Sequence, residues 1–273
     1  MAAGKIIIKK EKLESDAFND DEDYGLAGRF GGGYTDVLKD CGLSLERLKL
    51  GPLNRKKLIV LSLGGLLCHR VYRNDKSDRP ANRAPDLVYG KHLVYKRPYC
   101  EDFIKFCFER FEVGIWSSAK EWNLDTVLDS VMKGMRSKLL FAWDRNECID
   151  SGFKTLENKF KPIFMKELNK FWNYKSWRGG PYSSSNTLLI DDKPYKALLN
   201  PLHTGIFPTE YKGYHARDAA LGLNGELRVY LDKLADADDV PSFVKEHPFG
   251  QTFIAHTHPD WEFYSKIIYH LQN

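Results

Sequence analysis

The sequence predicts an α/β domain in which helices flank a doubly wound, mainly parallel sheet. Three short apolar runs are typical of buried parallel strands: Leu58–Leu61, Val113–Trp116 and Leu188–Ile190. Segments of helical periodicity separate these runs, and strands that alternate with helices predict right-handed crossover connections. Small or acidic polar residues follow each run, so we expect the functional residues at the strand ends.

Hydrophobic periodicity predicts the remaining elements in chain order. Helices are expected over Glu101–Phe111, Asn123–Met135, Met165–Trp172, Asn224–Leu234 and Pro241–Val244, and after Pro259. Further strands are expected over Leu139–Trp143 and Thr204–Phe207, and loops over residues 73–90 and 177–186. Asn123 is the expected N-cap of its helix, and Lys161–Leu168 is interpreted as a helix start.

The chain divides into two regions of different composition. Residues 1–50 contain a basic start, an acidic run and a glycine cluster, a composition that packs poorly. We expect a flexible or partly docked N-terminal arm there. Residues 51–273 form the predicted domain, which ends in a helical extension.

Composition limits the class of protein. The 273 residues include 41 Lys and Arg and 37 Asp and Glu, a net charge of +4 at pH 7, which is too small to predict nucleic-acid binding. The five cysteines form no CxxC pair, so neither a disulfide framework nor a structural zinc site is expected. No run approaches the roughly 18 apolar residues of a membrane span. An ordinary globular protein of a reducing compartment is expected.

Four motifs occur in an order known from one family. They are Lys96–Pro98, Trp116–Ala119, Lys166–Leu168 and Asp191–Tyr195. In this order they resemble the haloacid dehalogenase superfamily and, within it, the RNA polymerase II C-terminal-domain phosphatases of the NLI-interacting-factor type. The same domain also occurs in the receptor subunit of the mitochondrial inner-membrane translocase. The resemblance implies a Rossmann-like fold with a small insertion rather than a large cap.

The loop after the first strand departs from the family pattern. A phosphatase of the superfamily uses one carboxylate to attack phosphorus and a second, two residues on, as general acid and base. Ser62 and Gly64 occupy these two positions, and Leu66 replaces the usual threonine. Loss of the attacking residue alone costs about 10⁴ to 10⁶ in rate. We therefore expect no intact catalytic group, although weak residual phosphatase activity stays open.

The resemblance also implies an anion-binding site that is retained although the two catalytic carboxylates are absent. Ser117, with Ser118 beside it, matches the hydroxyl that binds a phosphoryl oxygen, and Lys166 matches the lysine that offsets its charge. Asp191 and Asp192 match the acidic pair near magnesium. Because a serine replaces one carboxylate of the expected ligand set, we expect Mg²⁺ to bind weakly or not at all.

These residues also have purely structural interpretations. Ser117 can cap the next helix, Lys166 can be a surface lysine, and Asp191 with Asp192 can form a turn before a proline. Their order and their positions after strands favour an inherited pocket. The segment His256–Asp260 contains metal-ligand residue types, but without an identifiable fourth ligand it is interpreted as a polar turn before a helix.

Residues 153–178 combine lysines with aromatic residues. Such a mixture can hold a phosphorylated or single-stranded partner. The favoured interpretation is an amphipathic helix with its aromatic side chains inward.

We interpret the chain as a pseudophosphatase that binds or scaffolds a protein partner, with a phosphorylated peptide as one candidate ligand. One alternative is an active magnesium-dependent phosphoserine or phosphothreonine phosphatase with a displaced catalytic group, for which Asp191, Asp192 and His69 are candidates. Another is a translocase-like or assembly subunit whose interaction surface lies on the N-terminal arm or the C-terminal helix. The expected compartment is the nucleus or the cytosol. Acidic residues in the arm disfavour mitochondrial import but leave it open.

Overall fold

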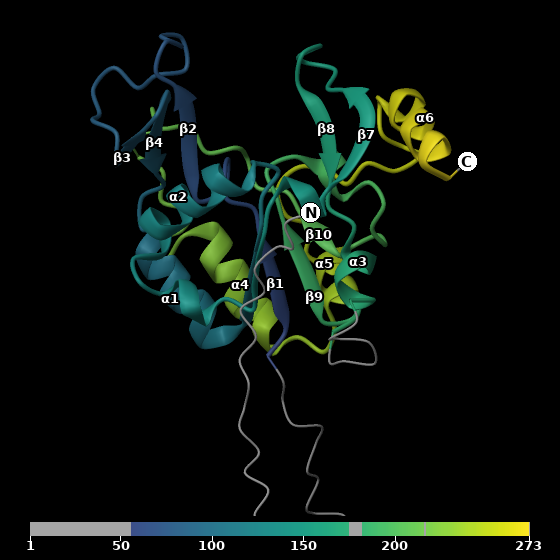
Figure 1. The fold of residues 1–273 in the computed structure, drawn as a ribbon. Helices are drawn as coiled ribbons and strands as arrows, with labels where there is room; N and C mark the ends of the chain where they lie inside the picture. Colours follow the sequence, from purple (N-terminus) through teal and green to yellow (C-terminus); the bar gives the residue numbers. More distant parts are fainter. Residues whose placement is uncertain (1–55, 175–181, 216, 273) are drawn as a thin grey trace, which may run out of the picture. The chain divides into compact units, whose positions relative to one another are not determined.

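The central sheet contains five parallel strands. The computed structural model describes residues 56–174, 182–215 and 217–272. The strand order is β10-β9-β1-β5-β6, and all neighbouring pairs are parallel. The strands are β1 (Leu58–Leu61), β5 (Glu112–Trp116), β6 (Phe141–Trp143), β9 (Thr187–Ile190) and β10 (Gly205–Ile206). The predicted doubly wound α/β fold is confirmed (Figure 1).

Strand β1 lies in the interior of the sheet, between β5 and β9. All four of its side chains are fully buried. Ile59 and Leu61 belong to one hydrophobic core, and Leu58 and Val60 belong to another. A continuous apolar run is typical of a strand that is covered on both faces, which is why this strand could be recognised from the sequence.

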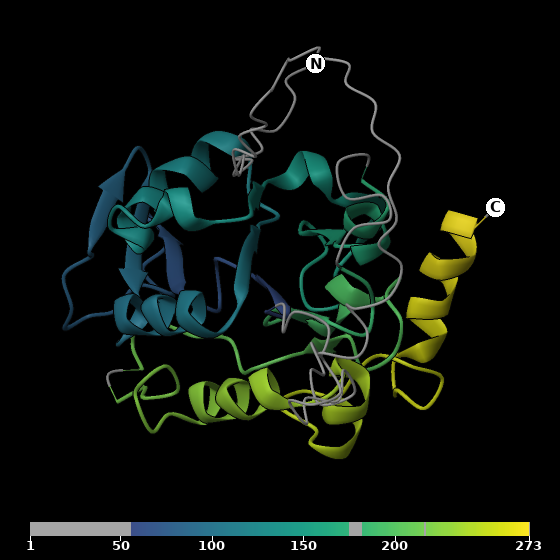
Figure 2. The same ribbon diagram turned by 90° about the horizontal axis from the view of Figure 1, so that it is seen from below.

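Helices cover both faces of the sheet. The core around Ile59 and Leu61 includes residues of α1 (Cys100–Arg110), α2 (Glu121–Met132), α4 (Glu226–Asp236) and α5 (Val240–Glu246). The opposite core includes residues of α3 (Leu168–Trp172) and of the 3₁₀-helix η3 (Pro194–Ala197). Figures 1 and 2 show α1 and α4 on one side of the sheet and α3 on the other. This packing fixes the positions of the strand ends.

Two antiparallel units accompany the parallel sheet. One is a three-stranded sheet of order β2-β4-β3, and the other is the pair β7 and β8. Their bounds are Cys68–Tyr72 (β2), Leu87–Tyr89 (β3), His92–Lys96 (β4), Ile149–Lys154 (β7) and Pro162–Met165 (β8). Figure 1 shows both units at the same end of the parallel sheet. They form the two sides of the site described below.

Several sequence-based expectations for these segments are wrong. Lys161–Leu168 contains strand β8 rather than a helix start, and the following helix begins at Leu168 instead of Met165. Pairing with β7 satisfies the backbone of this segment, so tertiary context overrides the helical pattern. Within the described part of the segment, residues 153–174 are therefore not one amphipathic helix, and part of the predicted loop 73–90 is β3.

Helix α2 also begins earlier than predicted. Its first residue is Glu121 and its N-cap is Lys120, so Asn123 is not the cap. Asn123 instead lines a cavity next to the sheet. The error arose because the apolar periodicity starts only at Leu124, whereas the helix already begins at Glu121.

The C-terminal helix α6 (Trp261–Gln272) follows the predicted extension. Its Tyr264 and Ile267 share a buried cluster with Ile163 and Met165 of strand β8. Within the described residues, no helix has both the length and the apolar character needed to cross a bilayer. The predicted arm at residues 1–50 and part of the predicted loop at 177–186 lie outside the described residues.

Candidate functional site

Polar side chains follow neighbouring strands at the carboxyl edge of the parallel sheet. Ser62 follows β1, Ser117 follows β5, and Asp191 follows β9. Arg145 comes two residues after β6. Ligands of open α/β sheets bind outside the carboxyl ends of the strands. The sheet therefore brings three of the sequence-predicted residues to one edge and adds Arg145, which the sequence analysis missed.

The loop after β1 presents no carboxylate. Ser62 is buried, and its hydroxyl donates a hydrogen bond to the Gly64 carbonyl at 3.3 Å. Gly64 is exposed, and a Cβ atom there would meet nothing within 4 Å. Leu66 is fully buried in the core, and its carbonyl accepts a hydrogen bond from Arg97 Nη1 at 3.2 Å. Arg97 of the predicted Lys-Arg-Pro motif thus supports the loop.

A buried group of two lysines and two aspartates lies beside this loop. Lys166 Nζ is 2.5 Å from Asp191 Oδ2, and both side chains are fully buried. Lys196 Nζ is 2.8 Å from Asp191 Oδ1 and 3.4 Å from Asp192 Oδ1. The Lys193 backbone N–H also donates to Asp191 Oδ1, at 3.0 Å. The sequence analysis missed Lys196, although its spacing of four residues from Asp192 was a readable signal.

Burial and the neighbouring charges act against each other within this group. Burial disfavours the Asp191 carboxylate, but the ammonium groups of Lys166 and Lys196 outweigh burial and hold its pKa well below the usual range. Burial and the Asp191 charge raise the pKa of Asp192 to about 6, although Lys196 opposes them. For Lys166, burial outweighs Asp191 and lowers the pKa. For Lys196, the two carboxylates outweigh burial and raise the pKa, so this ammonium stays charged.

The acidic pair does not fit Mg²⁺, the ion that phosphatases of the superfamily generally use. Mg²⁺ requires near-octahedral oxygen coordination. The Asp191 oxygens already accept from Lys166 and Lys196, and Asp192 Oδ1 faces Lys196. Over the described ranges, no group of three or more His, Cys, Asp and Glu residues could hold a metal ion. The segment His256–Asp260 forms a turn before α6, as expected.

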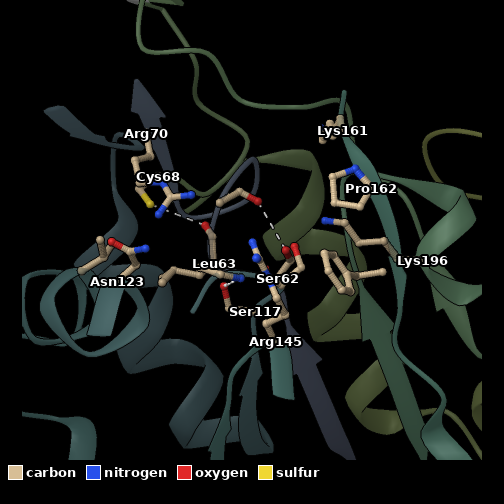
Figure 3. Close-up of a pocket in the computed structure, with 15 residues that line it drawn as sticks. Ser62, Leu63, Cys68, Arg70, Ser117, Asn123, Arg145, Lys161, Pro162 and Lys196 are labelled. Atoms are coloured by element: carbon tan, nitrogen blue, oxygen red, sulfur yellow. Dashed lines mark hydrogen bonds between the residues drawn. The ribbon is translucent and has the colours of Figure 1, made fainter. Parts of the chain in front are cut away.

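A cavity of about 210 Å³ opens at the same edge of the sheet. Figure 3 shows Arg70 at one side of the cavity and Lys161 and Pro162 at the other. Ser62, Ser117 and Ser118 line it, whereas the buried Lys166 does not. Its lining within the described chain has no acidic side chain and four basic ones: Arg70, Arg145, Lys161 and Lys196. The cavity therefore favours an anion.

Arg145 is held in place while most of its donors remain available. Its Nε donates to the Ser118 carbonyl at 2.9 Å, and its guanidinium lies 4.7 Å from the centre of the Phe164 ring. Neither of its Nη groups has a hydrogen-bond partner among the described residues. The buried Oδ1 of Asn123, which lines the same cavity, also has no partner there. Arginine with free Nη donors suits bidentate binding of a phosphate or carboxylate.

The purely structural roles suggested for Lys166 and Ser117 are not the ones that the structure shows. Lys166 is not a surface lysine, because its side chain is fully buried. Ser117 does not cap α2, whose N-cap is Lys120. Its Oγ instead accepts a hydrogen bond from the Ala119 N–H at 3.1 Å, which leaves its proton available for another acceptor.

The candidates for a displaced catalytic group are largely occupied. His69 Nδ1 accepts from the Gly213 N–H at 3.0 Å, and Nε2 lies 3.0 Å from Asp78 Oδ2. Burial lowers the pKa of His69, although Asp78 opposes the shift. Asp191 is fully buried and ion-paired. Asp192 is the remaining candidate, and it lines an adjoining cavity of about 320 Å³.

The fold and its strand-edge site define an α/β domain with a basic cavity at the carboxyl edge of a parallel sheet. A sequence profile described as NLI interacting factor-like phosphatase matches residues 57–241, which is more than half of the chain. The chain therefore belongs to the NLI interacting factor-like phosphatase family. The suspected family membership is confirmed.

The individual proteins that the chain resembles have low sequence identity to it. An uncharacterized FCP1 homology domain-containing protein of Schizosaccharomyces pombe is 28% identical over 209 residues, which cover 73% of this chain and 80% of that protein. A solved structure of Fcp1, described as an essential RNA polymerase II CTD phosphatase, matches 84% of this chain at 16% identity with a TM-score of 0.40. Fission yeast Fcp1 bound to beryllium fluoride matches 84% of this chain at 16% identity with a TM-score of 0.38. The matches span 66% and 65% of these two chains.

Proposed function

We propose that this protein is a pseudophosphatase that binds a phosphorylated segment of a protein partner and does not hydrolyse it. One observation carries the proposal: Ser62 and Gly64 occupy the carboxylate positions of a phosphatase loop beside a cavity that remains basic. The reacting groups are absent, whereas the side chains suited to an anion are present.

The chemistry at the loop after β1 argues against turnover. Serine attacks phosphorus only when a base removes its proton, and the resulting phosphoserine is a stable ester rather than a labile acyl-phosphate. The Ser62 hydroxyl donates a hydrogen bond to the Gly64 carbonyl and not to a base. Gly64 has no side chain that can protonate a leaving group. His69 is not free to act as the base, because both of its ring nitrogens are engaged.

The cavity offers complementary groups for a phosphorylated peptide. Arg145 supplies free Nη donors, and Arg70 and Lys161 add positive charge. Ser117 supplies a hydroxyl at the end of β5. Asn123 also lines the cavity, and its side-chain amide is a group of the kind that can hydrogen-bond a peptide main chain. These groups would serve both the phosphate and the chain that carries it.

A protein is favoured over nucleic acid as the partner. The net charge of the chain is only +4, and a nucleic acid needs a basic stripe or patch along an extended surface. Arg70, Arg145 and Lys161 instead line one cavity of about 210 Å³, and Arg70 and Lys161 also line the adjoining cavity of about 320 Å³. A single phosphorylated side chain suits this distribution of charge better than a polyanion.

Hydrolysis of a generic aryl phosphate by the pure protein tests the loss of catalysis. We expect no turnover above background with Mg²⁺, beside an active member of the family as the positive control. Magnesium-dependent turnover that Asp192→Asn abolishes would establish the active-phosphatase alternative instead. Asp192 is chosen because it is the acidic candidate that lines a cavity.

Peptide binding tests the retained function. A degenerate pool of fluorescent serine peptides would be compared in phosphorylated and unphosphorylated form by anisotropy. We expect binding of the phosphorylated pool alone. If a natural partner binds equally well after removal of the cavity charges, and loses binding when residues 1–50 or helix α6 is deleted, the assembly-subunit alternative holds.

A further inference from the structure

The position of Lys196 relative to the acidic pair is not explained by anion binding. Its ammonium contacts both Asp191 and Asp192 with one oxygen each, at 2.8 and 3.4 Å. Lys166 approaches Asp191 from the other carboxylate oxygen, at 2.5 Å. Lys196 therefore joins the two carboxylates in the way that a cation shared between them would.

The backbone fixes Lys196 in this position. The residue belongs to the 3₁₀-helix η3, and its own N–H donates to the Lys193 carbonyl at 3.1 Å. The Lys196 carbonyl accepts a hydrogen bond from the Lys166 N–H at 2.7 Å. Both lysines are thus tied together through their main chains as well as through Asp191. The side chain of Lys196 is also nearly buried, with 11% of its surface exposed.

Asp192 is closely packed on the side that faces Gly65, whereas its other side lines the cavity of about 320 Å³. Gly65 has a φ of +79°, and a Cβ atom at this position would lie 2.4 Å from the Asp192 carboxyl carbon. The carboxylate thus packs against the backbone on one side and faces Lys196 on another. A hydrated divalent ion would have to displace the Lys196 ammonium before it reached both aspartates.

We propose that the Lys196 ammonium permanently takes the place of the divalent cation at the acidic pair. A tethered ammonium balances the carboxylate charge and donates hydrogen bonds, but it offers no empty coordination position to a ligand oxygen. The acidic pair is then a closed structural element, and divalent ions do not bind to it. The inference does not depend on peptide binding in the neighbouring cavity.

The replacement Lys196→Ala tests the inference, because it removes the ammonium and opens space for an ion. Thermal unfolding would be followed with and without about 10 mM MnCl₂, and Mn²⁺ binding would be followed by the loss of the free-ion signal in electron paramagnetic resonance. A ligand that binds only the folded state raises the melting temperature. We expect a rise of about 3–6 °C for Lys196→Ala and less than about 1 °C for the natural chain.

Two matched variants control the experiment. Lys196→Arg keeps a positive charge at the site and should not respond to Mn²⁺. Lys161→Ala removes another lysine of the same cavity, one without an ion pair to either aspartate in the described residues, and should also not respond. In Lys196→Ala, a further Asp192→Asn replacement should abolish the gained response.

Other outcomes would contradict the inference. Mn²⁺ binding by the natural chain that Asp192→Asn abolishes would show that the site is open. A folded Lys196→Ala protein without a Mn²⁺ response would show that the lysine does not exclude the ion. Failure of this variant to fold even with Mn²⁺ also counts against it, because a bound ion should restore the charge balance. These outcomes are independent of aryl phosphate hydrolysis and of peptide binding.

Discussion

The carboxyl edge of the sheet carries two sets of charges that differ in their balance. Within the acidic group, Lys166 and Lys196 face Asp191 and Asp192 at short distances. In the cavity of about 210 Å³, Arg70, Arg145 and Lys161 have no acidic neighbour in the lining of the described chain. Both sets lie at the carboxyl edge of the same sheet but have different local chemistry.

The difference separates a structural role from a binding role. Buried charges persist in a folded protein when partners satisfy them, and such a group has little capacity left for a ligand. Charges without partners instead repel each other and attract an anion from solution. Replacements in the first set should therefore change stability, and replacements in the second should change binding.

The largest effect is expected from Asp191→Ala. The replacement leaves two ammonium groups without their shared carboxylate in a buried site. Loss of one partner of a buried ion pair costs about 3–5 kcal/mol of unfolding free energy. Urea denaturation measures the change. Glu262→Ala, which breaks the exposed pair with Lys266, is the control and should have little effect. Similar results for the two variants would contradict the assigned structural role.

Arg145→Ala should have the next largest effect, on binding. The variant removes two free Nη donors from the cavity, and a charge-assisted hydrogen bond contributes about 1.5–3 kcal/mol. Affinity for the phosphorylated peptide pool should fall by about tenfold or more in anisotropy titrations. The melting temperature should change little, because the guanidinium has few protein partners to lose.

Arg73→Ala is the matched control for this prediction. Arg73 is an exposed arginine next to strand β2, and it does not line the cavity. Its replacement removes the same charge from the protein and should leave the affinity unchanged. Equal losses of affinity in the two variants would mean that net charge, rather than the cavity, attracts the peptide.

A smaller effect is expected from Glu210, which lies 2.9 Å from Lys193 and 3.0 Å from Lys212. Burial opposes its ionisation, but hydrogen bonds from the two lysines outweigh burial and lower its pKa to about 2. Because this pKa is lower in the folded than in the unfolded chain, the stabilisation is complete above about pH 4.5 and is lost as the pH falls toward 2.

The replacement Glu210→Gln measures this contribution. Because Glu210 is partly exposed, we expect a loss of only about 1–2 kcal/mol at pH 7, with a flatter decline of stability between pH 5 and 2. Urea denaturation across this pH range gives both values. Stability curves that run parallel for the natural chain and the variant would contradict the assignment.

The sequence predicted the parallel sheet because its signal is local. Strand β1 is one apolar run, and polar residues follow it directly. The same local rule located Ser117 and Asp191. Applied to Trp143 at the end of β6, it would also have indicated Arg145. Arg145 belongs to none of the four family motifs, so the resemblance alone did not indicate it.

The antiparallel units could not be predicted in the same way. Strand β2 pairs with β4, where His69 lies opposite Tyr95, and neither segment shows a strong pattern alone. Strand β8 depends on β7 for its hydrogen bonds. Lys196 depends on the close approach of η3 to Lys166. These features arise from contacts between residues distant in the sequence, and local sequence patterns do not reveal such contacts.

The neighbouring glycines of the loop after β1 are under different constraints. Any side chain at Gly65 would collide with Asp192, whereas a Cβ at Gly64 would enter open space. The fold therefore requires glycine at position 65, whereas packing places no such requirement on position 64. In evolutionary terms, no packing barrier prevents a lineage from acquiring a carboxylate at Gly64. Whether glycine persists there depends on selection for the protein's activity, or for its absence, rather than on the stability of the fold.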